Sequence, residues 1–228
     1  MKRREYDQSC SLACALDRIG ERWSLLIVRE LSLGPLRFSD LVRNVGGAPT
    51  DVLTKRLRDL ESHDIVRRRD LSAPATGVAY ELTDVGWALE RPMLELSRWG
   101  LHFERVDDVV DLAPTSLPNA IRTISQPPAD AQLTVGLRSG GQDYWLRVEE
   151  GWIAAGRGEA EGPDLVLIGD PAPVLAALVA GEVADERIEI EGDRSALADL
   201  RAWVVLPERL RETARALVAE GSAEPAAV

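Results

Sequence analysis

The amino-acid sequence predicts an α+β chain of two domains, the first of which combines a helix-turn-helix with a β-hairpin. Two amphipathic helical patterns within residues 37–70 meet at a Gly-Gly-Ala-Pro turn, residues 46–49. In the second pattern, Leu53, Leu57 and Leu60 recur at the i, i+4, i+7 spacing of one buried helix face. A basic, strand-like run follows that helix, as in a helix-turn-helix with a wing behind it. The length of 228 residues exceeds one typical small domain.

Charge divides the chain into two unequal parts. Residues 1–105 contain 17 Lys/Arg and 16 Asp/Glu, a net charge of +1, whereas residues 106–228 contain 10 and 22, a net charge of −12. Because the acidity lies in the second part, the overall charge of −11 does not argue against nucleic-acid binding by the first. We expect a first domain over 1–106, a linker over 107–114 and a second domain over 115–228.

Helical periodicity accounts for most of the first domain. The sequence predicts one helix over 9–33, a short helix that begins near Ser39 with Ser39 as its cap, and a third helix over 50–63. A further helix begins at 83–84, and Pro92 either divides it into two helices or kinks it. A lone winged domain has little against which to bury the apolar sides of its first and last helices. We therefore expect both to pack against a second subunit.

Two strand-like runs, 65–71 and 78–82, form the expected wing. The connector 72–77 contains Pro and Gly, which favours a hairpin loop over a continued strand. Period-two alternation places three residues of the second run on the inner face: Val78, Tyr80 and Leu82.

Six clustered cations predict binding to duplex DNA, because guanidinium groups close to phosphates release condensed counterions. They are Lys55, Arg56 and Arg58 on the third helix and Arg67, Arg68 and Arg69 on the wing. Strand alternation places Arg67 and Arg69 on one face of the wing and Arg68 on the other. A threonine can contact a thymine methyl group, and an aspartate can accept from a cytosine amine. The candidate DNA-contacting residues are Arg37, Ser39, Thr50, Asp51, Thr54, Lys55, Arg58, Arg67, Arg69 and Thr76.

Simpler roles exist for these same residues. The six cations of the third helix and the wing can instead form a solvated charged face, with acidic partners nearby such as Asp59 and Glu61. Thr50 can serve only as a helix cap, and Asp51 can serve only to interact with the helix dipole.

Five motifs follow one another in the first part of the sequence: CSLACALDRIGERWSLLIVREL (10–31), GP (34–35), RFSDL (37–41), LTKRLRDLE (53–61) and YELTDVG (80–86). Through these motifs the chain bears a close resemblance, over about residues 8–103, to the HxlR-type winged helix-turn-helix regulators. It implies a dimeric transcription regulator that binds a pseudo-palindromic DNA operator. Pro49 and Asp51 depart from the family pattern, which usually has a small polar residue at the first position and a basic or polar residue at the second. The resemblance therefore does not specify the operator sequence.

The second part is similar to the sterol-carrier (SCP2-like) fold, in which a mixed sheet and helices enclose a hydrophobic tunnel. The similarity rests on WLRVEEG (145–151), PDLVL (163–167), a short helix ending at Gly181, and IEIEGD (188–193). It makes Trp145 and Trp152 candidates for lining a pocket for an apolar small-molecule effector. An apolar interior in a small sheet is ordinarily only a core. A domain that serves merely as a scaffold is therefore the simpler interpretation.

Cys10 is a candidate redox residue, because some relatives of the HxlR type sense electrophiles or oxidants through a cysteine at this position. A thiol reacts only when it is exposed with a depressed pKa, which Arg18 would assist. The alternative is that Cys10 and Cys14 are two small buried side chains.

The sequence shows no enzyme signature. His63 and His102 are the only histidines, and neither has metal-ligand neighbours at the required spacing. We expect no cofactor, no metal, no membrane segment and a cytoplasmic location. The predicted function is that of a dimeric, HxlR-like DNA-binding regulator controlled by an apolar ligand of the second domain. The alternative is a lipid carrier that uses the winged domain mainly for dimerisation.

Overall fold

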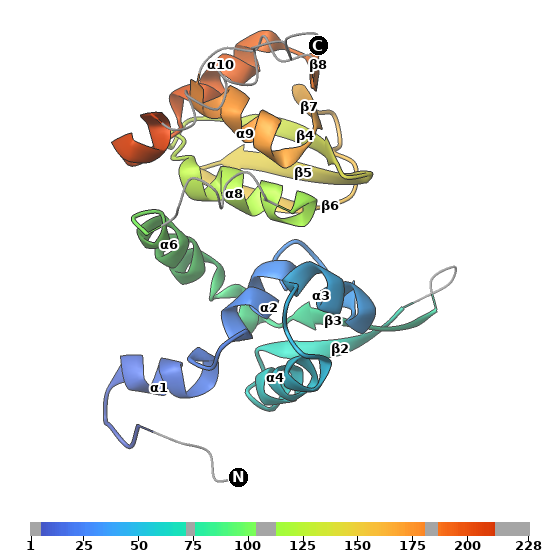
Figure 1. The fold of residues 1–228 in the computed structure, drawn as a ribbon, viewed down its shortest axis with the longest axis vertical. Helices are drawn as coiled ribbons and strands as arrows, with labels where there is room; N and C mark the ends of the chain where they lie inside the picture. Colours follow the sequence, from blue (N-terminus) through green and yellow to red (C-terminus); the bar gives the residue numbers. More distant parts are fainter. Residues whose placement is uncertain (1–5, 72–75, 104–112, 181–186, 213–228) are drawn as a thin grey trace, which may run out of the picture. The chain divides into compact units, whose positions relative to one another are not determined.

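The computed structural model describes residues 6–71, 76–103, 113–180 and 187–212, and the chain divides into two compact units, Met1–Met93 and Leu94–Val228 (Figure 1). Most of the expected linker, residues 107–112, lies outside the described residues, as do the connector residues 72–75 and Gly181. The expected domain bounds therefore stay a prediction, and each unit is considered by itself.

The first unit consists of short helices packed on a small antiparallel sheet with the strand order β1-β3-β2. Leu53, Leu57 and Leu60 are at most 1% exposed, which confirms the predicted buried stripe of the third helix. They pack with Ile27 and Leu41 of the two preceding helices in one core. The elements are α1 (Ser11–Ile19), α2 (Ser24–Leu31), β1 (Leu36–Arg37), α3 (Phe38–Val45), α4 (Thr50–Ser62), β2 (Val66–Leu71), β3 (Gly77–Leu82), α5 (Asp84–Trp87) and α6 (Glu90–Gly100), which crosses into the second unit.

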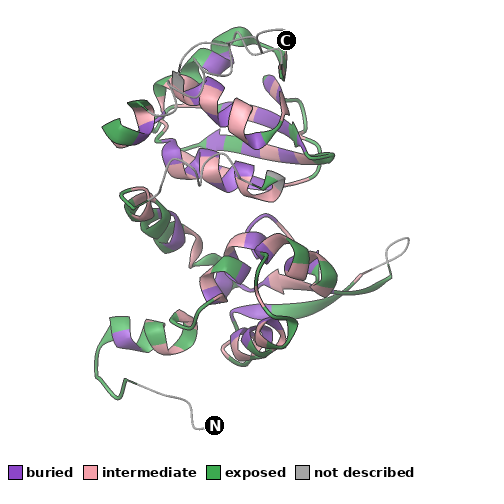
Figure 2. Ribbon diagram, viewed as in Figure 1, coloured by how far each residue is buried: buried purple, intermediate pink, exposed green. Residues whose placement is uncertain are grey.

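The predicted single helix over 9–33 is wrong, because the chain breaks between α1 and α2. Gly20 caps the end of α1, and Trp23 adopts φ +80° at the start of α2. This left-handed conformation costs a non-glycine residue about 1–3 kcal/mol. It places the Trp23 side chain against the core while Leu12 of α1 stays 67% exposed. Tertiary burial of Trp23 thus overrides the continuous helical periodicity, and most of α1 lies exposed (Figure 2).

Two further details differ from the expectation. Ser39 is not the cap of α3, since Arg37 pairs with Ala79 in the sheet and the helix begins at once with Phe38. Val78 is not on a buried face but 44% exposed, because it lies out along the wing where no helix covers the hairpin.

Pro92 does not kink a helix. It lies in the first turn of α6, where a backbone N–H would have no partner within the helix, so proline costs no hydrogen bond there. The two-helix alternative is therefore the one observed. Thr83 caps the preceding helix α5, and its hydroxyl accepts from the Gly86 N–H at 3.2 Å.

The second unit is a mixed five-stranded sheet with the order β6-β5-β4-β7-β8, in which only β4 and β7 are parallel. The expected mixed sheet with helices is therefore confirmed. The helix α8 was not predicted, although Leu117, Ile121 and Ile124 recur at helical spacing. The elements are η1 (Pro114–Ser116), α8 (Leu117–Ile124), β4 (Leu133–Ser139), β5 (Gln142–Glu149), β6 (Trp152–Arg157), β7 (Leu165–Gly169), α9 (Pro171–Ala180), β8 (Ile188–Gly192) and α10 (Arg194–Ala202).

Helices cover the apolar face of this sheet, with α8 against β5 and β6, and α9 and α10 against β7 (Figure 1). Tyr144 and Leu146 alternate inward and are completely buried. Arg122 of α8 is 1% exposed, and its Nε donates to the carbonyl oxygen of Ile153 at 2.8 Å. This charge-assisted bond fastens the helix to the edge strand β6.

Candidate nucleic-acid interface

The turn before α4 directs the polar side of that helix outward. Gly46 and Gly47 both have positive φ, +60° and +65°, a backbone that glycine adopts without strain. The chain then reverses and α4 begins at Thr50, with its leucine stripe facing inward. Pro49 occupies the cap position without a side-chain cap, so Thr50 does not serve as the cap.

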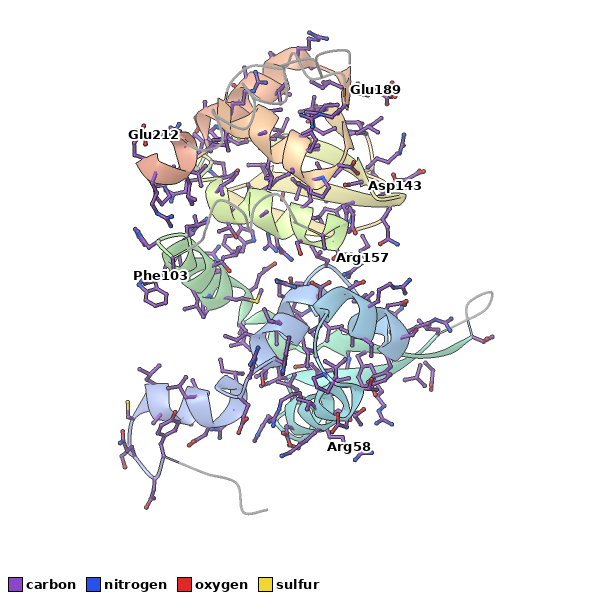
Figure 3. The ribbon with its side chains drawn as sticks, in the orientation of Figure 1. Arg58, Phe103, Asp143, Arg157, Glu189 and Glu212 are labelled. Carbon is purple, nitrogen blue, oxygen red and sulfur yellow. The ribbon has the colours of Figure 1, made fainter. Side chains whose placement is uncertain are left out.

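Exposed polar residues follow the outer side of α4. Thr50, Asp51, Lys55 and Arg58 are exposed, and Arg58 projects from the helix into solvent (Figure 3). Lys55 and Arg58 form no ion pair with any residue that the structure describes. Thr54 is half-buried, and its hydroxyl donates to the Thr50 carbonyl oxygen at 2.8 Å. The outer side of α4 thus offers two uncommitted cations and short polar groups near the start of the helix.

Arg56 belongs to the interior and not to this surface. Its side chain is 11% exposed and lies 2.8 Å from the Asp59 carboxylate and 3.4 Å from the Glu21 carboxylate. Counting Arg56 among the phosphate-binding cations was wrong, because two carboxylates already neutralise its charge.

The wing arginines are all paired with acidic residues. Arg67 and Arg69 share the carboxylate of Glu81, at 2.7 Å and 3.2 Å. Arg68 instead pairs with Glu61 of α4 at 3.1 Å, and its guanidinium lies 5.7 Å from the ring centre of Tyr80. The predicted separation of Arg68 from the other two is confirmed.

The structure brings Arg37 to the same sheet face as Arg67 and Arg69. In the register of the sheet, Arg37 and Arg69 flank Ala79, and Ala79 is 1% exposed among these long side chains. A Cβ added to Gly77 would lie 3.4 Å from the Arg37 guanidinium, so this side chain extends along β3. The opposite face packs on the core.

The predicted residues therefore form two groups, because α4 contacts the core face of the sheet and these three arginines lie on the other face. Ser39 at the start of α3 and Thr76 before β3 are both exposed, and neither side chain has a hydrogen-bond partner among the residues that the structure describes. Sequence reasoning set aside Arg68, which is the wing cation on the α4 side. Its alternation with Arg67 and Arg69 was the signal for that placement.

Burial of Cys10 and Cys14 was the wrong alternative, since both are exposed free thiols. Cys10 precedes α1, and hydrogen bonds from the backbone N–H groups of Ala13 and Leu12 hold the pKa of its thiol below the ordinary value. Arg18 does not assist Cys10; its guanidinium donates to the Cys14 sulfur at 2.9 Å.

The tryptophans of the second unit do not meet in the helix-covered interior. Trp145 alternates with the buried Tyr144 and Leu146, so it lies on the other face of the sheet, where its ring covers Gly156. Trp145 therefore does not share a sheet face with Leu146, and its part in lining a pocket stays a prediction. Trp152 begins the edge strand β6, and the Arg122 guanidinium lies 5.5 Å from its ring centre.

The described residues contain no group of three or more His, Cys, Asp or Glu placed to hold a metal ion. None of their helices is long and apolar enough to span a membrane.

Comparisons with known proteins match the first unit. The profile of the HxlR-like helix-turn-helix family matches residues 18–108. The HTH-type transcriptional regulator YodB of Bacillus subtilis is 33% identical over 42% of this chain and 86% of its own length. The uncharacterized HTH-type transcriptional regulator YvaP of the same organism is 35% identical over 37% of this chain and 79% of its own length.

Among solved structures, the reduced form of B. subtilis YodB has a TM-score of 0.38 at 32% identity, covering 42% of this chain and 95% of that one. The family profile covers the helix-turn-helix and the wing described above, and the matched region covers most of YodB at 33% identity. The chain therefore belongs to the HxlR-like helix-turn-helix family of transcriptional regulators.

Proposed function

We propose that the first unit binds duplex DNA by placing α4 in the major groove. The observation that carries this proposal is the pair of exposed cations, Lys55 and Arg58, opposite the buried leucine stripe of α4. They contact phosphates, while Thr50, Asp51 and Thr54 near the start of the helix are directed at base edges. Family membership supports the same surface.

The wing contributes contacts to the flanking backbone. Arg68, on the α4 side, holds the phosphate nearest the groove, and Arg37, Arg67 and Arg69 supply positive charge on the other face of the hairpin. Since Arg67, Arg68 and Arg69 are all paired in the structure, DNA must compete with Glu61 and Glu81 for them.

The active form is a homodimer on a pseudo-palindromic operator. Exposed apolar side chains support it, because large exposed apolar groups mark contact surfaces. On α1 these are Leu12 and Leu16, and on α6 and just after it they are Leu96, Trp99 and Phe103. Two recognition helices then enter successive major grooves about 34 Å apart.

The second unit is proposed to bind an apolar small molecule in an SCP2-like manner. Its mixed sheet, with helices over one apolar face, supports this resemblance. A ligand there regulates DNA binding only if it binds the DNA-competent and incompetent arrangements unequally. The carrier alternative is less favoured, because it gives no role to the exposed Lys55 and Arg58.

Thiol sensing through Cys10 is a second candidate function. Its exposure and lowered thiol pKa favour a reactive thiolate at the start of α1, a helix with an exposed apolar side. Modification at that place would alter the proposed subunit contact.

Fluorescence anisotropy on duplex DNA from the region upstream of the chain's own gene tests the main proposal. We expect Arg58→Ala to weaken binding about tenfold and to lower the slope of log K against log salt by about one. Arg147→Ala, which removes an exposed arginine of the second unit, is the matched control. An unchanged affinity and salt slope in Arg58→Ala would overturn the proposal.

Apolar solvent extraction of the purified protein, followed by mass spectrometry, tests the ligand. A bound apolar molecule in stoichiometric amount supports ligand control, whereas protein that yields none and takes up no apolar probe contradicts it.

A further inference from the structure

We propose that Glu21 is a positioning residue for DNA recognition, which couples the orientation of α1 to that of the recognition helix α4; this inference rests on the proposed function. Glu21 lies in the junction between α1 and α2, and Arg56 lies in the middle of α4. Their ion pair joins two elements that are 35 positions apart in the sequence but belong to the same unit.

Arg56 forms ion pairs with one carboxylate inside α4 and one outside it. Its side chain is only 11% exposed, and its Nε is buried without a hydrogen-bond partner among the described residues. One acidic partner, Asp59, lies three residues on in the same helix and therefore cannot fix α4 to anything else. Among the described residues, Glu21 is the one charged partner of Arg56 outside α4, so it connects the helix to the junction.

Trp23 provides a second contact from the same junction. The end of its ring lies 3.8 Å from the position of a Cβ on Gly47, in the turn that leads into α4. The guanidinium of Arg22 lies over the same Trp23 ring, 4.9 Å from the ring centre. The junction thus contacts α4 at its middle and the turn before its start, and the left-handed backbone of Trp23 is held by that packing.

The junction also determines where α1 lies. This helix contacts α4 as well, while its Leu12 and Leu16 stay exposed on the side proposed for the second subunit. A change in α1 on dimerisation, or on modification of Cys10, therefore reaches the recognition helix through the junction. Glu21 is 66% exposed, so replacing it removes this coupling without opening the core.

The direction in which DNA affinity changes when Glu21 is replaced distinguishes a positioning role from a purely electrostatic one. Removing a carboxylate from a DNA-binding unit by itself strengthens attraction to phosphate. If Glu21 positions α4, its removal weakens site-specific binding in spite of the more favourable charge. Binding to unrelated duplex, which needs phosphate contacts only, stays equal or becomes tighter.

The experiment measures specific and non-specific binding of the full chain at two salt concentrations. We expect Glu21→Gln to weaken operator binding about threefold and Glu21→Arg about tenfold, since the latter also repels Arg56. The conservative Glu21→Gln variant should keep the wild-type melting temperature. Asp84→Asn, which removes one exposed carboxylate at the start of α5, is the charge-matched control and should not weaken operator binding.

Operator binding by Glu21→Arg at wild-type strength overturns the inference. Equal losses on operator and unrelated DNA also overturn it, since the residue would then act through folding of the unit and not through the position of α4. If the wild type itself shows no site-specific binding, the proposed function fails. Amide hydrogen exchange in α4 then still tests the coupling, because Glu21→Arg must speed exchange there, and unchanged exchange contradicts it.

Discussion

The Nε of Arg67 donates to the carboxylate of Glu81 across the wing at 2.7 Å, and the same carboxylate accepts from Arg69 at 3.2 Å. Burial raises the pKa of Glu81, but the hydrogen bonds and charges of the two arginines outweigh it and hold that pKa below its ordinary value. Glu81 is therefore ionised at neutral pH and offsets one of the two wing charges.

Replacing Glu81 by Gln should strengthen DNA binding, because it releases Arg67 and Arg69 for phosphate. We expect an affinity gain of several-fold and a slope of log K against log salt that is steeper by about one. Anisotropy titrations over a range of salt concentrations measure both, with Glu150→Gln in the second unit as the charge-matched control. A weaker or salt-independent interaction would contradict the prediction.

The same ion pairs predict a pH dependence of stability. Since the pKa of Glu81 is lowered in the folded state, its contribution is present above the ordinary glutamate pKa of about 4.3 and is lost as pH falls through the lowered value. Glu81→Gln should therefore lower the free energy of unfolding at pH 7 and reduce its fall in acid. Urea unfolding at several pH values between 3 and 7 measures this, and parallel curves for the two proteins would refute it.

Cys10 should be alkylated at a lower pH than an ordinary thiol. Its pKa is lowered by the N–H groups of Ala13 and Leu12, so the thiolate accumulates below the usual value of about 8.5. The rate of iodoacetamide modification against pH, read by mass spectrometry in Cys14→Ser protein, gives the midpoint. A midpoint at or above that of free cysteine would exclude the activation.

Trp99→Ala should shift the proposed dimer toward monomer. Trp99 is 60% exposed and forms an edge-to-face pair with the 66% exposed Phe103 at 4.8 Å, so the substitution removes apolar contact surface without opening a core. Sedimentation equilibrium should show a dissociation constant raised at least tenfold. Val205→Ala, which removes another exposed apolar side chain, is the control and should leave the dimer intact.

Gly156→Ala should destabilise the second unit by about 1–3 kcal/mol through overpacking. A Cβ at this position would lie 2.5 Å from the ring of Trp145 on the neighbouring strand, and the ring would have to move. Thermal unfolding measures the loss. Gly100→Ala in α6, where a Cβ meets nothing within 4 Å, is the control and should leave stability unchanged or higher.

Local sequence patterns were sufficient to predict which sides of α4 and of the wing face the core. The spacing of Leu53, Leu57 and Leu60 specified the buried side of α4, and hence the exposed side that carries Lys55 and Arg58. Period-two alternation likewise separated Arg68 from its neighbours. Such periodicities state which side of an element faces the interior, and that information is contained in the element itself.

The partners across elements were decided only by the tertiary structure. The sequence around Arg56 does not indicate that its ion-pair partner is Glu21. Likewise, the apolar helical periodicity of 9–33 continues through the position of Trp23, where the structure breaks the helix. Nor does the sequence around Trp145 reveal that its ring lies on Gly156, away from the helices. Periodicity carries no information about which distant residue approaches a side chain, because that depends on how the elements pack. Packing made Arg56 a largely buried cation paired with Asp59 and Glu21, and it placed the ring of Trp145 over Gly156 on the outer sheet face.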